Sequence, residues 1–144
     1  MAHILAIDDD RAVLSTVKIA LESAGHQVVL AEDGAKGLPL VQSKKFDLLI
    51  IDIFMPGMDG LETMNMVHQE HPDMPIIVMS GHEFRLVPDT APDFLHMATK
   101  LGAVASLKKP FRSSELLNIV SQCLAKAQSS AVQAKPLRQP RCPD

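Results

Sequence analysis

Short apolar runs alternate along the chain with longer stretches in which apolar residues recur at helical spacing, from residue 3 to about residue 127. The runs are rich in Val, Ile and Leu and lack polar alternation, which is typical of strands buried on both faces. Strands that alternate with helices predict βα units around one parallel sheet. We expect strands over residues 3–7, 27–31, 47–51, 75–79 and 104–108.

The stretches between and after these runs predict five helices. Asp10 is placed to cap the first of them, and Gly25 to end it. The second has weaker signals, because Gly37 and Pro39 both fall inside it. The expected helices cover residues 11–24, 34–44, 60–71, 91–101 and 113–127.

Beyond residue 127 the chain turns rich in Pro, Gln, Lys and Arg and holds little to bury. We therefore expect one domain over residues 1–127 and a disordered C-terminal tail over residues 128–144. The fold class is α/β: a doubly wound, five-stranded parallel sheet with the strand order 2-1-3-4-5.

Composition and charge exclude several classes of protein. The net charge is −3, and no clustered basic excess suggests a nucleic-acid partner. No run approaches the roughly 18 apolar residues of a membrane helix, and the first residues lack the basic region of a signal peptide. Two cysteines, Cys123 and Cys142, make no disulfide framework. These features indicate a reduced, cytoplasmic protein without a membrane or nucleic-acid partner.

Charged residues follow three of the predicted strands. Asp8 and Asp9 follow the first, Asp52 follows the third, and Lys109 follows the fifth. In the predicted order, strands one and three are neighbours at the switch point where open α/β sheets bind ligands. Carboxylates that lie so close together raise one another's pKa unless a cation lies between them. Mg²⁺ prefers oxygen ligands of this kind. Ser80, after the fourth strand, adds a hydroxyl donor.

These residue types indicate phosphoryl transfer. A carboxylate can attack phosphorus to form an aspartyl phosphate, while Mg²⁺ and a lysine offset the charge on the transferring oxygens. Asp52 is the best candidate for the nucleophile, because it stands alone after its strand. We expect Lys108 to face solvent, since it alternates with Lys109 along the strand.

At these residues the chain resembles the receiver domains of two-component response regulators, of the stand-alone chemotaxis type. The resemblance covers about residues 3 to 126 and rests on several motifs in the family's order. They are Ile4-Leu5-Ala6-Ile7-Asp8-Asp9-Asp10, Asp47-Leu48-Leu49-Ile50-Ile51-Asp52 with Met55-Pro56-Gly57-Met58-Asp59-Gly60, Pro75-Ile76-Ile77-Val78-Met79-Ser80-Gly81, and Lys109-Pro110-Phe111.

The resemblance implies a flavodoxin-like receiver fold and a role for each matching residue. Asp8 and Asp9 would hold Mg²⁺, together with Asp52 and the backbone carbonyl of Phe54. Asp52 would be the phosphoacceptor. Ser80 and Lys109 would contact the phosphoryl group, and the Lys109-Pro110 bond would be cis.

The resemblance also implies partners and activity. A sensor histidine kinase or a phosphotransfer protein would supply the phosphoryl group. Signalling would pass to a downstream protein target by contact or by phosphorelay. The only activities expected are the chain's own phosphorylation and dephosphorylation, so the protein would not be an enzyme in the ordinary sense.

Two departures from the family leave a second function open. Ser106 stands where receivers usually carry an aromatic residue, and the stretch from Ser80 to Gly102 is longer than usual, mainly through loop residues 82–90. A binding module with a silenced switch is therefore an alternative. A phosphatase with an aspartate nucleophile is disfavoured, because Phe54 stands where such enzymes need a second aspartate. A zinc site at His68 and His71 lacks a third nearby ligand.

Overall fold

The strands form one parallel sheet in the predicted order. The computed structural model describes residues 2–52, 60–80 and 103–134, without the side chains of 60, 61, 80 and 126–134. The sheet order is β2-β1-β3-β4-β5, and every pair is parallel. Each strand lies within one residue of its predicted bounds. The strands are β1 (His3–Ile7), β2 (Gln27–Ala31), β3 (Leu48–Asp52), β4 (Ile76–Ser80) and β5 (Ala103–Lys108).

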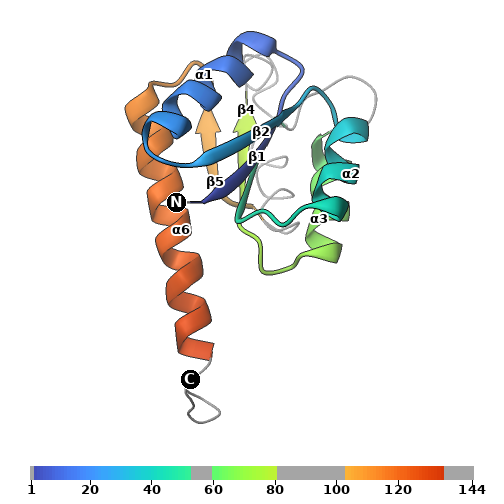
Figure 1. Cartoon of the computed structure of the whole chain (residues 1–144), viewed down its shortest axis with the longest axis vertical. Helices are drawn as coiled ribbons and strands as arrows, with labels where there is room; N and C mark the ends of the chain where they lie inside the picture. Colours follow the sequence, from blue (N-terminus) through green and yellow to red (C-terminus); the bar gives the residue numbers. More distant parts are fainter. Residues whose placement is uncertain (1, 53–59, 81–102, 135–144) are drawn as a thin grey trace, which may run out of the picture.

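Helices cover both faces of the sheet. Figure 1 shows α1 and α6 on one side of the strands and α2 and α3 on the other. None of the helices that the structure describes is both long and apolar enough to cross a membrane. Their bounds are α1 (Arg11–Ser23), α2 (Gly34–Ser43), α3 (Gly60–Glu70) and α6 (Ser113–Ala134), and the predicted helix over residues 91–101 lies outside the described residues.

The last helix runs further than the sequence predicts. α6 ends at Ala134 and not at residue 127, so it enters the segment for which we expected disorder. Residues 128–134 contain neither Gly nor Pro and include two alanines, and this composition favours continued helix. Pro136 follows the helix end by two residues. Residues 135–144, the rest of the predicted tail, lie outside the described residues.

The near-continuous apolar strands are explained by burial on both faces. Leu5 and Ile7 of β1 pack in the cluster that includes residues of α2 and α3, whereas Ile4 and Ala6 pack in the cluster that includes residues of α1 and α6. All four side chains are fully buried, as are those of Leu48–Ile51 in β3. The central strands are therefore fixed between two apolar layers, which positions the residues that follow them.

The first helix begins at the predicted residue and ends at Ser23, one residue before the predicted end. The Asp10 carboxylate accepts a hydrogen bond from the Ala12 N–H at 2.9 Å, and this caps α1. Gly25 follows the helix with a φ of 94°, a backbone conformation that glycine adopts without strain.

Gly37 has a packing role that helix propensity does not reveal. A Cβ at this position would lie 2.4 Å from Ile7 Cδ1, so a larger residue here would force the end of the buried Ile7 side chain to move. Gly37 is buried within α2, and Pro39 also lies inside that helix. The helix therefore forms despite two unfavourable residues, because it packs tightly on the sheet.

We predict that Gly37→Ala lowers the free energy of unfolding by about 1 kcal/mol or more, because overlap with Ile7 costs more than the gain in helix propensity. Ile7→Val removes the overlapping methyl group and costs about 0.5–1.5 kcal/mol by itself. In the Ile7→Val background, Gly37→Ala should therefore cost clearly less. Urea unfolding followed by circular dichroism measures all four proteins, since the chain has no Trp or Tyr. Strictly additive losses would contradict the close contact.

Candidate functional site

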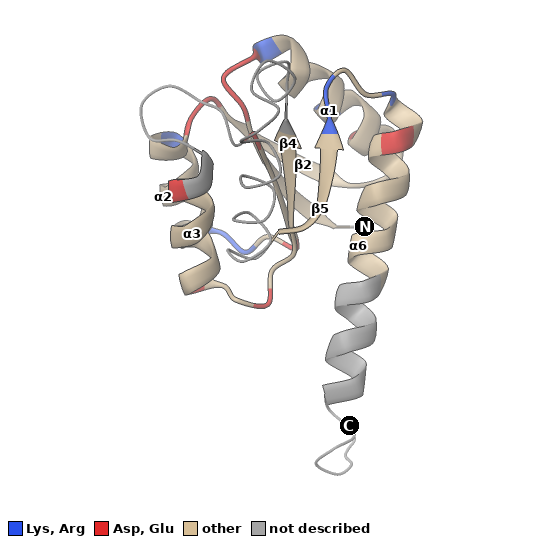
Figure 2. Ribbon diagram, turned by 180° about the vertical axis from the view of Figure 1, so that it is seen from behind, with Lys and Arg blue, Asp and Glu red and all other residues tan. Residues whose placement is uncertain are grey.

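Adjacent strands end together at one edge of the sheet. β1 and β3 are paired with Ile7 opposite Ile51, so Asp8 and Asp52 follow at neighbouring strand ends. Figure 2 shows Lys and Arg residues in blue at the end of β5 and Asp and Glu residues in red on loops at the same end of the sheet. Parallel strands direct the residues after their carboxyl ends to this common edge.

The Lys109 ammonium lies between two buried carboxylates. Its Nζ is 2.7 Å from Asp8 Oδ2 and 2.8 Å from Asp52 Oδ2, and it donates a hydrogen bond to Asp52. Asp8 is 0% exposed and Asp52 4% exposed, while the Lys109 side chain is 16% exposed. The next residue back, Lys108, is exposed, as the alternation along β5 predicts. The structure thus brings together charges that are far apart in the sequence.

Asp8 is held in place by the backbone around it. Its Oδ1 accepts a hydrogen bond from the Asp10 N–H at 2.9 Å, and its own N–H donates to the Ala31 carbonyl at 3.1 Å. The Lys109-Pro110 peptide bond is cis, as the family resemblance implies. The pocket is therefore built from the ends of β1, β3 and β5, each anchored by its own strand.

The acidic side chains fit a divalent cation. Asp8, Asp9 and Asp52 each offer a carboxylate oxygen, and these oxygens lie within 4.8 Å of one another. Asp8 Oδ2 is buried and accepts no hydrogen bond of good geometry, although it forms the ion pair with Lys109. Such an oxygen, next to an exposed Asp9, suits Mg²⁺, which binds a few carboxylates and keeps several waters.

Burial and neighbouring negative charge raise the pKa values of the Asp8 and Asp9 carboxyl groups, and a bound cation would lower them again. Burial raises the pKa of the Asp8 carboxyl, and the nearby Lys109 only partly opposes this. Burial and the adjacent Asp8 carboxylate raise the pKa of Asp9. Burial lowers the pKa of Lys109, but its contacts with Asp52 and Asp8 outweigh burial and leave the pKa raised, so Lys109 remains a cation.

Several predicted site residues lie outside the part of the chain that the structure describes. The backbone of Ser80 ends β4 opposite Lys108, but its side chain is not among those described. Phe54 and loop residues 82–90 lie outside the described residues. Ser106 is described, and it is exposed on β5. The roles of Ser80 and of the Phe54 carbonyl therefore stay predictions.

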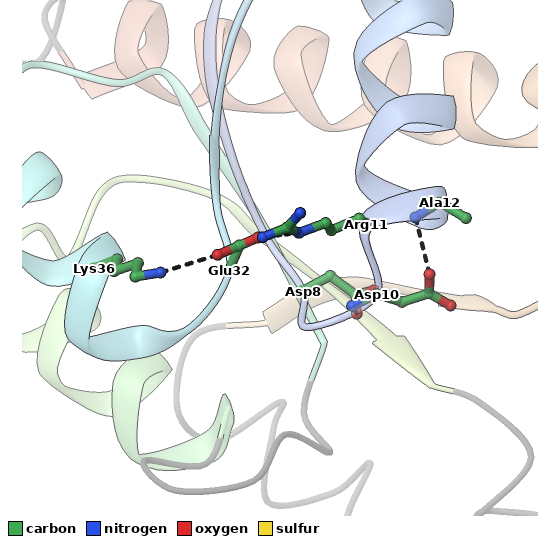
Figure 3. A network of polar contacts seen from close by, with 6 residues as sticks. All are labelled: Asp8, Asp10, Arg11, Ala12, Glu32 and Lys36. Carbon is green, nitrogen blue, oxygen red and sulfur yellow. Dashed lines mark hydrogen bonds and ion pairs between the residues drawn. The ribbon is translucent and has the colours of Figure 1, made fainter.

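Sequence reasoning missed a charged cluster at the rim of the pocket. Glu32, the first residue after β2, pairs with Arg11 Nε and with Lys36 Nζ, the latter at 2.9 Å. Figure 3 shows the Glu32 carboxylate between these two cations, with Asp8 beside them. The available signals were the place of Glu32 after a predicted strand and the spacing of four residues to Lys36.

Sequence comparison with known proteins agrees with the motifs found at this site. A family model described as the response regulator receiver domain matches residues 4–121. The transcriptional regulatory protein FixJ of Bradyrhizobium diazoefficiens is 33% identical over 130 residues, which are 90% of this chain and 60% of FixJ. The transcriptional regulatory protein GlrR of Escherichia coli is 34% identical over 123 residues, which are 85% of this chain and 26% of GlrR. The chain thus spans only part of these relatives.

Solved structures of whole receivers have the same fold. The response regulator receiver domain protein (CheY-like) of Methanospirillum hungatei superposes with a TM-score of 0.82 at 28% identity, covering 90% of this chain and 98% of that chain. The chemotaxis protein CheY4 of Vibrio cholerae gives a TM-score of 0.77 at 31% identity, covering 85% of this chain and 98% of its own.

We predict that Asp8→Asn raises the melting temperature at neutral pH without metal, by about 2–6 °C, and removes most of the rise that excess MgCl₂ gives the wild type. A carboxyl whose pKa is raised by folding contributes stability that is lost as pH rises through that pKa. Ionised Asp8 therefore destabilises the metal-free fold at neutral pH, whereas Asn still accepts from the Asp10 N–H.

The difference between Asp8→Asn and wild type should shrink as the pH is lowered and Asp8 takes up its proton. Thermal unfolding across a pH series, with and without MgCl₂, measures both effects. Exposed Asp73 at the opposite edge of the sheet supplies the matched control, since Asp73→Asn makes the same chemical change away from the pocket. An unchanged Mg²⁺ response in Asp8→Asn would contradict the assignment.

Proposed function

Because the chain belongs to the response regulator receiver family, we propose that it works as a single-domain response regulator whose Asp52 accepts a phosphoryl group. The observation that carries this proposal is the Asp52 carboxylate, 2.8 Å from Lys109 Nζ and grouped with Asp8 and Asp9. The receiver match covers residues 4–121, and in this proposal the output passes through protein contacts or phosphorelay. The phosphodonor would be a histidine kinase or a phosphotransfer protein.

The transfer is a simple displacement at phosphorus. An Asp52 carboxylate oxygen attacks the phosphorus atom, the P–N bond of the donor phosphohistidine breaks, and the imidazole nitrogen keeps the electron pair. Mg²⁺, held by Asp8, Asp9 and Asp52, would supply positive charge to the transferring oxygens. Lys109 keeps its charge because of its raised pKa, and it can turn from the two carboxylates to the new phosphoryl oxygens.

A change in the contacts of Lys109 on phosphorylation could alter the surface of the protein near β5. Lys109 directly follows β5, whose residues Val104 and Ser106 are exposed. A change in the partners of Lys109 therefore acts first on the end of β5 and on the segment that leads to α6. We propose that this region presents the phosphorylation state to a downstream protein.

The exposed Ser106 favours a second candidate, a binding module whose surface does not respond to phosphorylation. A serine cannot fill the volume of the aromatic residue usual at this place, so the usual coupling through that side chain is absent. Amide NMR shifts of residues 103–108, recorded with and without the phosphoryl group, separate the candidates. Changes in amide shifts confined to residues next to the pocket favour the binding module that does not respond to phosphorylation. Changes that extend along β5 favour a surface that responds to phosphorylation.

We predict that incubation with acetyl phosphate and MgCl₂ adds one phosphoryl group to the wild type and none to Asp52→Asn. The carboxylate attacks phosphorus and acetate leaves, so the product is an acyl phosphate that hydroxylamine removes. Intact-protein mass spectrometry measures the adduct, and Asp73→Asn, a matched change at the opposite edge of the sheet, should be phosphorylated like wild type. An adduct of equal yield on Asp52→Asn, or none on the wild type, would overturn the proposal.

A further inference from the structure

The rim cluster of Arg11, Glu32 and Lys36, here called the charged ridge, lies at the same sheet edge as the acidic pocket. Glu32 follows β2, whose last residue Ala31 is paired with Ile7 and accepts a hydrogen bond from the Asp8 N–H at 3.1 Å. The ridge is therefore about one to two strand spacings, roughly 10 Å, from the pocket. Figure 3 shows its three side chains in one line past Asp8.

Both cations stand where local stability disfavours them. Arg11 begins α1 and Lys36 lies in the first turn of α2, so each faces the positive end of a helix dipole. Their ion pairs with Glu32 are solvent-exposed, with Arg11 83% and Lys36 62% exposed, and such pairs contribute little to stability. Residues that break a local rule for little structural gain are candidates for a functional role.

The acidic residues of the pocket and around it create a negative electrostatic field, which these cations can offset. Three carboxylates and one lysine leave it with a net charge of −2 when all are ionised (3 negative, 1 positive). Asp10 and Asp33, which cap α1 and α2, add two further carboxylates close by. Mg²⁺ held by the three carboxylates would cancel the charge of −2, but the carboxylates of Asp10 and Asp33 would still repel a donor that carries two negative charges, unless nearby cations offset their field.

We propose that Arg11 and Lys36 attract phosphodonors whose phosphoryl group is dianionic, and that Glu32 competes with the donor for these two cations. The inference rests on the proposed function, because it concerns how the donor reaches Asp52. Glu32 is already bound by both cations, and an arriving phosphoryl group has to displace it. The two cations of the charged ridge thus favour donors with more negative charge, and Glu32 slows the approach of these donors by competing for the cations.

The two directions of effect make a sharp test. With acetyl phosphate, a dianion, Arg11→Gln and Lys36→Gln should each slow phosphorylation of Asp52 about three- to fivefold at low ionic strength. Glu32→Gln should accelerate it by a similar factor, since it removes the competing anion and leaves both cations. With phosphoramidate, a monoanion that transfers the same group as its P–N bond breaks, each change should be about half as large on a logarithmic scale.

The salt dependence of the rates and a matched control variant distinguish long-range electrostatic attraction of the donor from damage to the fold. All the changes should fall below about twofold at ionic strengths above roughly 0.15 M, where the Debye length is shorter than the distance to the pocket. Lys45→Gln makes the same charge change at the opposite edge of the sheet and should leave both rates unaltered. Thermal unfolding checks that each variant is folded.

Single-turnover rates by intact-protein mass spectrometry decide between the outcomes. Equal rates in all variants, or slowing by Glu32→Gln, would overturn the ridge and leave the phosphoacceptor role of Asp52 intact. Changes that persist at high salt or are equal for both donors would also overturn it. If neither donor phosphorylates the wild type, the proposed function and the ridge both fall.

Discussion

The contact of Lys109 with Asp8 and Asp52 is the interaction on which the site depends. Two carboxylates that are almost completely buried meet one ammonium group at 2.7 and 2.8 Å. Burial of ion pairs costs desolvation that their attraction only partly recovers, and apolar residues of similar volume would often be more stable. The arrangement therefore stabilises the fold poorly and indicates a site kept for its chemistry.

The apolar sheet is what makes this costly arrangement possible. Ile7 and Ile51, which precede the two acidic ends, are fully buried and paired with each other. Gly37 lets α2 pack directly against Ile7, so the end of β1 is fixed from its side as well as along the strand. A rigid support of this kind holds like charges at a distance that isolated loops would not maintain.

The sequence predicts the strands and the pocket well, for a physical reason. Strands buried on both faces leave continuous apolar runs, and the charges that follow them, such as Asp8 and Asp52, must meet at one sheet edge. Other features depend on packing that no local pattern reveals. The contact of Gly37 with Ile7 joins residues that are far apart in the chain. The bridging by Glu32 depends on side-chain directions after β2. The end of α6 at Ala134 is a different case, because the local composition of residues 128–134 does favour helix and the prediction gave more weight to their polarity.

Charge balance connects the pocket, the ridge and the proposed switch. A divalent cation would bring the net charge of −2 in the pocket to zero, but a dianionic phosphoryl group on Asp52 would make it negative again. Lys109 is then attracted by the new oxygens as well as by Asp8, and it is the next residue after β5. No aromatic side chain stands at Ser106, so in the proposed switch the backbone of β5 would carry this movement. That strand has a register shift against β4 at Ile76 and Ile77, near its start, whereas the pairing close to Lys108 is regular. A displacement of Lys109 would therefore pass first through the regular pairing, toward the exposed Val104, so the surface of β5 is where a response to phosphorylation would arise.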